Sequence, residues 1–107
     1  MVSALGEDLR AVLGALGAAP GDRATLLQFS SAFCAPCRAT RRVLAQVAAA
    51  VPGVVHVEVD AEAHLDVVRQ LGIDRTPTTL VLDGQAREVV RAAGQPRPQD
   101  VLQALPS

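Results

Sequence analysis

Cys34-Ala35-Pro36-Cys37 is the stretch that decides how this 107-residue chain folds and which chemistry it carries. Its two cysteines are the only ones in the sequence, and they stand where an apolar run ends and a helical pattern begins. A separation of three residues is too short to crosslink distant parts of a fold, and two ligands alone do not complete a tetrahedral metal site. The spacing suits two thiols that form and break a disulfide with each other.

Apolar patterns on both sides of the cysteines predict alternating helices and strands. Runs rich in β-branched and other apolar residues predict strands over 26–30, 54–59, 78–83 and 87–91. Helical spacing predicts a first helix that contains Leu5, Leu9 and Leu16, with Ser3 as N-cap and Gly17 as its end. The same spacing predicts further helices over 37–51, 63–71 and 99–105.

The order of these elements predicts an α/β fold in one domain, residues 1–107. A strand-helix-strand unit implies parallel pairing through a right-handed crossover, and Asp83-Gly84 predicts a closing antiparallel hairpin. The expected result is a four-stranded mixed sheet with helices on both faces.

Composition excludes several classes of function. The formal net charge of −1 argues against general nucleic-acid binding, which needs a basic surface. No apolar run approaches the roughly 20 residues that span a bilayer, and the first residues do not form a secretory signal. We therefore expect a cytoplasmic protein without a membrane segment; the alternative is a domain of a membrane-anchored protein whose N-terminus was cut. In a reducing compartment two cysteines are more often catalytic than structural.

The two cysteines are expected to have different roles. Cys34 falls just before or in the first turn of the following helix, where free backbone N–H groups and the helix dipole lower the pKa of a thiol. Pro36 fits this first turn, where a missing N–H costs little. Cys37 is predicted to be more buried and placed to attack a mixed disulfide formed at Cys34. Cys34 is thus the expected nucleophile and Cys37 the resolving thiol.

Phe33-Cys34-Ala35-Pro36-Cys37-Arg38 resembles the W-C-G-P-C-K motif of the thioredoxin family, and Arg75-Thr76-Pro77-Thr78 resembles the proline loop of that family. The similarity runs over about residues 26–105 and implies the thioredoxin fold. It also implies a monomeric protein-disulfide reductase without metal or organic cofactor. Its partners would be disulfide-containing proteins and an electron donor like thioredoxin reductase. The substrate-binding positions that the resemblance implies are Phe33, Ala35, Pro36, Thr76, Pro77 and Gly94.

The resemblance further implies a cis bond before Pro77 and pairing of the Thr76 backbone with an extended substrate segment. On pattern alone, a second interpretation stays open, in which Pro77 simply starts a strand.

The chain departs from the family pattern beneath the cysteines. Gln28 stands where the family has a buried Asp that is thought to manage the proton of the second cysteine, and His56 stands where it often has a Lys. If the strands that carry them are neighbours, the two side chains face each other under the motif. One hypothesis is that His56, directly or through water, helps to deprotonate Cys37. The other is that His56 is an ordinary strand histidine with satisfied hydrogen bonds.

Further departures concern the rim of the motif and the start of the fold. Phe33 replaces Trp, which keeps an apolar contact but loses the indole N–H, and Ala35 replaces Gly, which stiffens the loop. The first strand of the family is expected to be absent, because only Met1 and Val2 precede the first helix.

Other functions are compatible with parts of the same pattern. A redox-sensing or partner-binding module with little turnover is favoured by the missing Asp, but the intact C-A-P-C and T-P-T motifs favour catalysis. An oxidase or isomerase differs in reduction potential, and the uncharged Ala35-Pro36 pair favours a reductant. A zinc site would need both cysteines with His56 and His64, whose spacing fits poorly. The arginines of the next helical turns form either a docking patch for an acidic partner or a solvated face: Arg38, Arg41 and Arg42.

Overall fold

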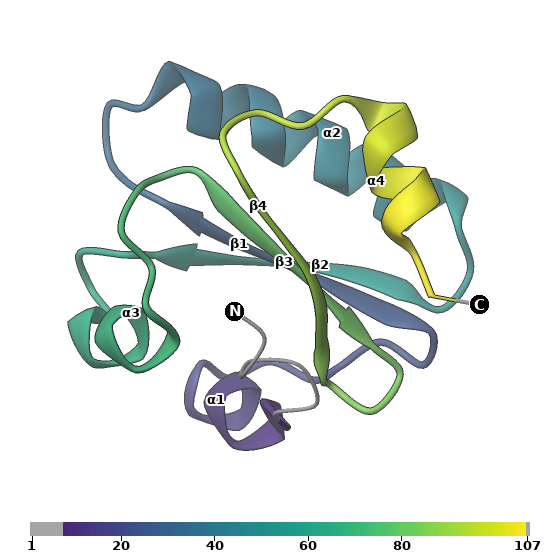
Figure 1. Ribbon diagram of the computed structural model, residues 1–107, viewed down its shortest axis with the longest axis horizontal. Helices are drawn as coiled ribbons and strands as arrows, with labels where there is room; N and C mark the ends of the chain where they lie inside the picture. The colour runs from purple at the N-terminus through teal and green to yellow at the C-terminus, as the bar shows by residue number, and fades with distance from the viewer. Residues whose placement is uncertain (1–7, 107) are drawn as a thin grey trace.

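A four-stranded sheet lies between two layers of helices in the computed structural model, which describes residues 8–106 (Figure 1). Helices α2 and α4 cover one face of the sheet, and α1 and α3 lie on the other (Figure 1). The predicted α/β architecture is therefore confirmed. The strands are β1 (Ala24–Ser30), β2 (Val54–Asp60), β3 (Thr78–Asp83) and β4 (Glu88–Ala93). The helices are α1 (Arg10–Ala15), α2 (Ala35–Ala50), α3 (Leu65–Leu71) and α4 (Pro98–Ala104).

The sheet is mixed, with the strand order β2-β1-β3-β4. β1 pairs parallel with β2 and antiparallel with β3, and β3 pairs antiparallel with β4. Every residue of β1 is buried, because this strand has neighbours at both edges and helices over both faces. A strand in that position is expected to consist of a nearly continuous apolar run, which makes its largest polar side chain, Gln28, informative.

Each face of the sheet packs its own apolar cluster. Side chains alternate between the faces along a strand, so Leu26 and Leu27 of β1 enter different clusters. Phe29 is the largest of the fully buried side chains, and aliphatic residues fill most of the remaining volume. The face toward α1 and α3 is apolar around Phe29, whereas the face toward α2 becomes polar near the carboxyl end of β1. This polar end lies under the start of α2.

The first helix begins later than the sequence pattern predicts. Asp8 forms an antiparallel bridge with Arg87, and its Oδ1 accepts a hydrogen bond from the backbone N–H of Arg10 at 2.9 Å. The chain is therefore extended at Asp8, and Leu9 takes the N-cap position instead of a place inside the helix. Gly17 follows the helix with φ +74°, as predicted for its end. The predicted cap and the expected lack of a preceding strand concern residues 1–7, outside the described part of the chain.

The third helix also begins late, at Leu65 and not at residue 63. Asp60 accepts from the backbone N–H of Glu62 through Oδ1 and from that of Ala63 through its carbonyl oxygen. This turn after β2 uses the residues that were predicted to start the helix. His64 then takes the N-cap position.

Candidate redox site

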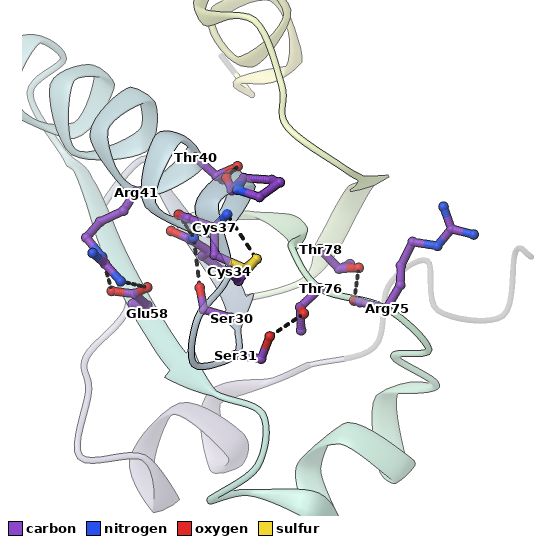
Figure 2. The surroundings of a disulfide bond; sticks show 12 residues. Ser30, Ser31, Cys34, Cys37, Thr40, Arg41, Glu58, Arg75, Thr76 and Thr78 are labelled. Carbon is purple, nitrogen blue, oxygen red and sulfur yellow. Dashed lines mark hydrogen bonds and ion pairs between the residues drawn. A yellow bond between two sulfur atoms is a disulfide. The ribbon is translucent and has the colours of Figure 1, made fainter.

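Cys34 and Cys37 form a disulfide at the start of α2 (Figure 2). Their Cα atoms are 5.2 Å apart, and Cys34 occupies the N-cap position of the helix. Cys34 is half-buried at the surface, whereas Cys37 is 1% exposed. The first cysteine is thus the more accessible of the two to a second molecule, and the second is covered by the protein.

The sulfur of Cys34 caps the helix. The backbone N–H of Cys37 donates to Cys34 Sγ at 3.1 Å, in the geometry that a serine or aspartate oxygen uses at an N-cap. The first turn contains no acidic residue, and Pro36 lies where its missing N–H costs nothing. After reduction, the same N–H group and the positive end of the helix dipole favour a thiolate at Cys34.

The proline loop lies beside the disulfide, and the Thr76–Pro77 bond is cis, as the resemblance implied. Thr76 Oγ1 is 2.8 Å from Ser31 Oγ, which ties this loop to the chain just before the cysteines (Figure 2). The backbone N–H of Gly94 donates to the Pro77 carbonyl oxygen at 2.8 Å, and Gly94 has φ +86°. The structure therefore brings the predicted substrate-binding residues of both loops to one end of the sheet.

Gln28, Ser30 and His56 form a polar layer under the first turn of α2. Gln28 Nε2 donates to the Cys37 carbonyl oxygen and to Ser30 Oγ, both at 2.9 Å. Its Oε1 lies 2.9 Å from His56 Nε2. Because an amide oxygen can only accept a hydrogen bond, His56 must be the donor in this last bond, so its Nε2 carries the hydrogen. The predicted contact between Gln28 and His56 is confirmed.

His56 and Glu58 are neighbouring titratable groups on β2. Burial lowers the pKa of His56; the Glu58 carboxylate opposes this shift, and Arg41 adds to it. The pKa of Glu58 is lowered first by its hydrogen bond from Arg41; burial opposes that shift, and a bond from Ser30 supports it. His56 is therefore held as neutral imidazole close to an ionised carboxylate.

Sequence reasoning missed the pairing of Arg41 with Glu58. The guanidinium makes two bonds to the carboxylate, from Nε at 2.7 Å and from Nη2 at 2.9 Å (Figure 2). Only the register between α2 and β2 brings the two residues together, and the sequence shows no sign of it. Arg41 is therefore not a free charge of the proposed arginine patch. The pair borders a cavity of about 340 Å³, whose lining is Ser30, Ser31, Ala32, Arg41, Glu58 and Asp60.

The outer rim of the disulfide is apolar and open. Phe33 is fully exposed, because its φ of +57° turns the side chain away from the protein. The expectation that the Phe33 side chain keeps an apolar contact within the protein is therefore wrong. Ala35 and Pro36 are exposed beside it. Arg75 points away from the disulfide (Figure 2).

The two histidines are not brought together with the cysteines as metal ligands. Within residues 8–106 no group of three or more Cys, His, Asp or Glu side chains has the arrangement of a metal site. His56 bonds Gln28, and His64 Nδ1 lies 3.2 Å from the Asp60 carbonyl oxygen. No helix in the same described range is long and apolar enough to cross a membrane.

Comparison with known proteins gives one consistent result. The family model described as Thioredoxin matches residues 18–105. Thioredoxin-2 of Pyricularia oryzae is 31% identical over 80 residues, which are 74% of this chain and 47% of that protein. Thioredoxin H-type of Oryza sativa subsp. indica is 32% identical over 72 residues, 65% of this chain and 59% of that protein. The chain thus spans only about half the length of these curated relatives.

Solved structures agree. Thioredoxin NaTrxh from Nicotiana alata superimposes with a TM-score of 0.67 at 26% identity, over 77% of this chain and 70% of that one. Thioredoxin f from spinach chloroplast gives a TM-score of 0.70 at 21% identity, over 94% of this chain and 85% of that one, and supports the fold. With its fold, its Cys34–Cys37 disulfide and a family match over most of its length, the chain belongs to the thioredoxin family.

Proposed function

We propose that this chain is a thiol-disulfide oxidoreductase that reduces disulfides of other proteins. The observation that carries the proposal is the contrast between the two sulfurs at one helix N-terminus. Cys34 is half-buried and its Sγ accepts a backbone N–H bond, while Cys37 is 1% exposed and bonded to it in a disulfide. An exposed nucleophile joined to a shielded resolving thiol is the arrangement that a dithiol–disulfide cycle needs.

The cycle transfers two electrons from the dithiol to the substrate. The Cys34 thiolate attacks one sulfur of a substrate disulfide, the substrate S–S bond breaks, and the first substrate thiolate leaves and takes up a proton. The Cys37 thiolate, after losing its proton, attacks Cys34 Sγ in the mixed disulfide. The second substrate thiol is released, and the Cys34–Cys37 bond forms again. A further dithiol system must then reduce this bond, for which we propose an electron donor of the thioredoxin-reductase kind.

The substrate would lie across the rim of the disulfide. The exposed side chains of Phe33, Ala35 and Pro36 offer it apolar surface. The backbone of Thr76 and Pro77, supported by Gly94, would pair with an extended segment of the substrate in the manner of strand addition.

Gln28 and His56 would influence the proton of Cys37. Gln28 bonds the backbone of Cys37 and connects it to His56. Since His56 is neutral and already donates through Nε2, it would act by holding the Gln28 amide in place under Cys37 and not by taking the thiol proton through that atom. A His56→Ala variant is expected to change the pH–rate profile of disulfide reduction; an unchanged profile would remove His56 from the mechanism.

The surroundings of the protein are part of the same proposal. We propose a monomer that forms a single domain and acts in the cytoplasm. The family points to a disulfide substrate and a reducing partner, and the described helices include none that could cross a membrane.

Reduction of insulin disulfides by dithiothreitol, followed by turbidity, tests the function. The chain should accelerate the reaction, and Cys34→Ser should reduce the rate to that of dithiothreitol alone. Equal rates for the two proteins would instead support the second candidate, a redox-sensing or partner-binding module, which the loss of the buried Asp at Gln28 favours.

The reduction potential separates a reductase from an oxidase of the same fold. Reducing members of the fold have reduction potentials of about −270 mV, and strong oxidants have potentials of about −120 mV. Equilibration with glutathione buffers should place this chain near the reducing value, and a potential at the oxidising end would reassign it.

A further inference from the structure

Thr79 carries a buried hydroxyl that the cycle described above does not use. The residue is 3% exposed, and its Oγ1 has no hydrogen-bond partner among the residues that the structure describes. Other buried threonine hydroxyls are paired: Thr25 accepts from the Gly21 N–H, and Thr40 donates to the Pro36 carbonyl oxygen. Because buried polar groups in folded proteins normally have partners, the exception at Thr79 indicates a role.

Thr79 lies beside the polar layer under the cysteines. It is directly opposite Gln28 in the antiparallel ladder of β1 and β3, where facing Cβ atoms are about 4.5–5.5 Å apart. Val81, two residues along β3 and so on the same face, packs in one cluster with Leu44 of α2. Gln28 in turn donates to the Cys37 carbonyl oxygen. The Thr79 hydroxyl therefore lies on the sheet face that supports the first turn of α2.

The hydrogen-bond donors of the other residues in the polar layer are already used. Both amide hydrogens of Gln28 go to Cys37 and Ser30, and the His56 Nε2–H goes to Gln28 Oε1. Ser30 hydrogen-bonds to Glu58. Thr79 thus holds the hydroxyl hydrogen that remains for a new acceptor.

Reduction of the disulfide creates such an acceptor. In the oxidised protein Cys37 Sγ is bonded to Cys34 Sγ and carries no charge. In the mixed disulfide Cys37 must become a thiolate, and burial of this sulfur raises the cost of that anion. A hydroxyl that donates to the thiolate offsets the cost and lowers the pKa of the thiol.

We propose that Thr79 is this donor: its hydroxyl bonds the Cys37 thiolate, directly or through one buried water, and so speeds the resolving step. The proposal deepens the oxidoreductase function proposed above and rests on it. It places a neutral hydroxyl in the part of the site where the family has a carboxylate.

The charged groups near Cys37 come from β2 and α2. His56 and Glu58 lie on β2, and Arg38 and Arg41 lie on α2 itself. On this face β1 and β3 present uncharged groups near the cysteines, and α4 contributes the exposed pair of Arg97 and Asp100. Each of these groups is unchanged by a substitution at Thr79, so a shift at Cys37 reports on the hydroxyl.

The direct test is the pKa of Cys37, measured by NMR with 13Cβ-labelled cysteine in a Cys34→Ser background, which leaves one thiol to titrate. Thr79→Val keeps the shape of the side chain but removes the hydroxyl, and should raise the pKa of Cys37 by about one unit, a tenfold change in thiolate fraction. Thr79→Ser should restore it, and Thr79→Ala should repeat the effect of valine. The control, Thr25→Val, should leave the pKa unchanged.

The resolving step can be followed without any protein substrate. In reduced protein with both cysteines, 5,5′-dithiobis(2-nitrobenzoate) releases one thionitrobenzoate when Cys34 attacks and a second when Cys37 resolves the mixed disulfide. Thr79→Val should slow only the second release, by about threefold at pH 7, because the tenfold loss of thiolate is partly offset by the higher nucleophilicity of a more basic thiolate. The rate should recover at alkaline pH. An unchanged Cys37 pKa in Thr79→Val, or equal shifts for valine and serine, would overturn the proposal. Failure of insulin reduction alone would overturn the proposed function and leave the Thr79 result standing.

Discussion

Cys34 and Cys37 share one turn of helix, but they lie in two different environments. Cys34 is only half-buried, accepts a backbone N–H bond through its sulfur and adjoins an apolar rim. Cys37 is enclosed, and the layer beneath it consists of an amide, hydroxyls and a neutral imidazole in place of a carboxylate. The helix terminus therefore lowers the thiol pKa of Cys34 only. The thiol pKa of Cys37 depends on the side chains of the sheet that lie below it.

The largest expected effect is the exchange of either sulfur for oxygen. Cys34→Ser should abolish disulfide reduction completely, because no exposed nucleophile remains. Cys37→Ser should instead accumulate a stable mixed disulfide with substrate, because the resolving thiol is missing. Gel electrophoresis without reductant distinguishes the two variants. A trapped complex in Cys34→Ser and none in Cys37→Ser would reverse the assignment of the roles.

Removal of the amide under Cys37 is the next largest change. Gln28→Leu has a similar volume but leaves the partners of the amide without their bonds, which should cost about 1–3 kcal/mol of unfolding free energy. At about 4–8 °C per kcal/mol, thermal unfolding should show a clear loss. The control, Gln46→Ala on the exposed side of α2, should stay within about 0.5 kcal/mol. Equal losses in both variants would show that the layer is not structurally important.

Acid should destabilise the fold in two successive ranges. The lowered pKa of His56 means that the unfolded chain binds this proton more readily, so stability falls as the pH drops below about 6.5. Glu58 has a lowered pKa as well, and its contribution is lost at still lower pH, below about 4.3. Urea unfolding at several pH values measures both. His56→Gln should weaken the pH dependence of the unfolding free energy in the upper range. An unchanged pH dependence there would contradict a buried, neutral His56.

The smallest effect is expected at the surface ion pair beside the layer. Arg41→Gln should lower the free energy of unfolding only slightly, because both partners are partly exposed, and the loss should shrink in high salt. It should also raise the pKa of Glu58, since the hydrogen bond from Arg41 is the main cause of its lowering. Arg42→Gln, on the same helix, is the control. A larger loss at Arg42 would contradict the special position of Arg41.

The sequence predicted the elements that follow from local patterns. The apolar runs gave the strands, and Cys34 at a helix start followed from the change of period after Ser30. The contact between Gln28 and His56 was predictable once β1 and β2 were expected to be neighbours: His56 is opposite Leu26, two residues before Gln28, so the two side chains lie on the same face. The predicted start of a helix was wrong in two places, where Asp8 and Asp60 form other local structure in place of the first helical residues.

Other features of the site depend on tertiary register and left no local signal. Arg41 meets Glu58 only through the packing of α2 on β2, and the unpartnered hydroxyl of Thr79 shows only when its whole surroundings are known. The outward position of Phe33 comes from its positive φ, which a phenylalanine rarely adopts and a sequence pattern does not indicate.

The contrast between the two sulfurs is tested most directly by alkylation of the reduced protein with iodoacetamide across a pH series, with mass spectrometry to locate the label. Half-buried Cys34 at the helix terminus should be modified well below the free-cysteine pKa of about 8.5, while fully buried Cys37 stays unmodified in the folded protein. Modification of Cys37 first, or of both at the same pH, would contradict the account.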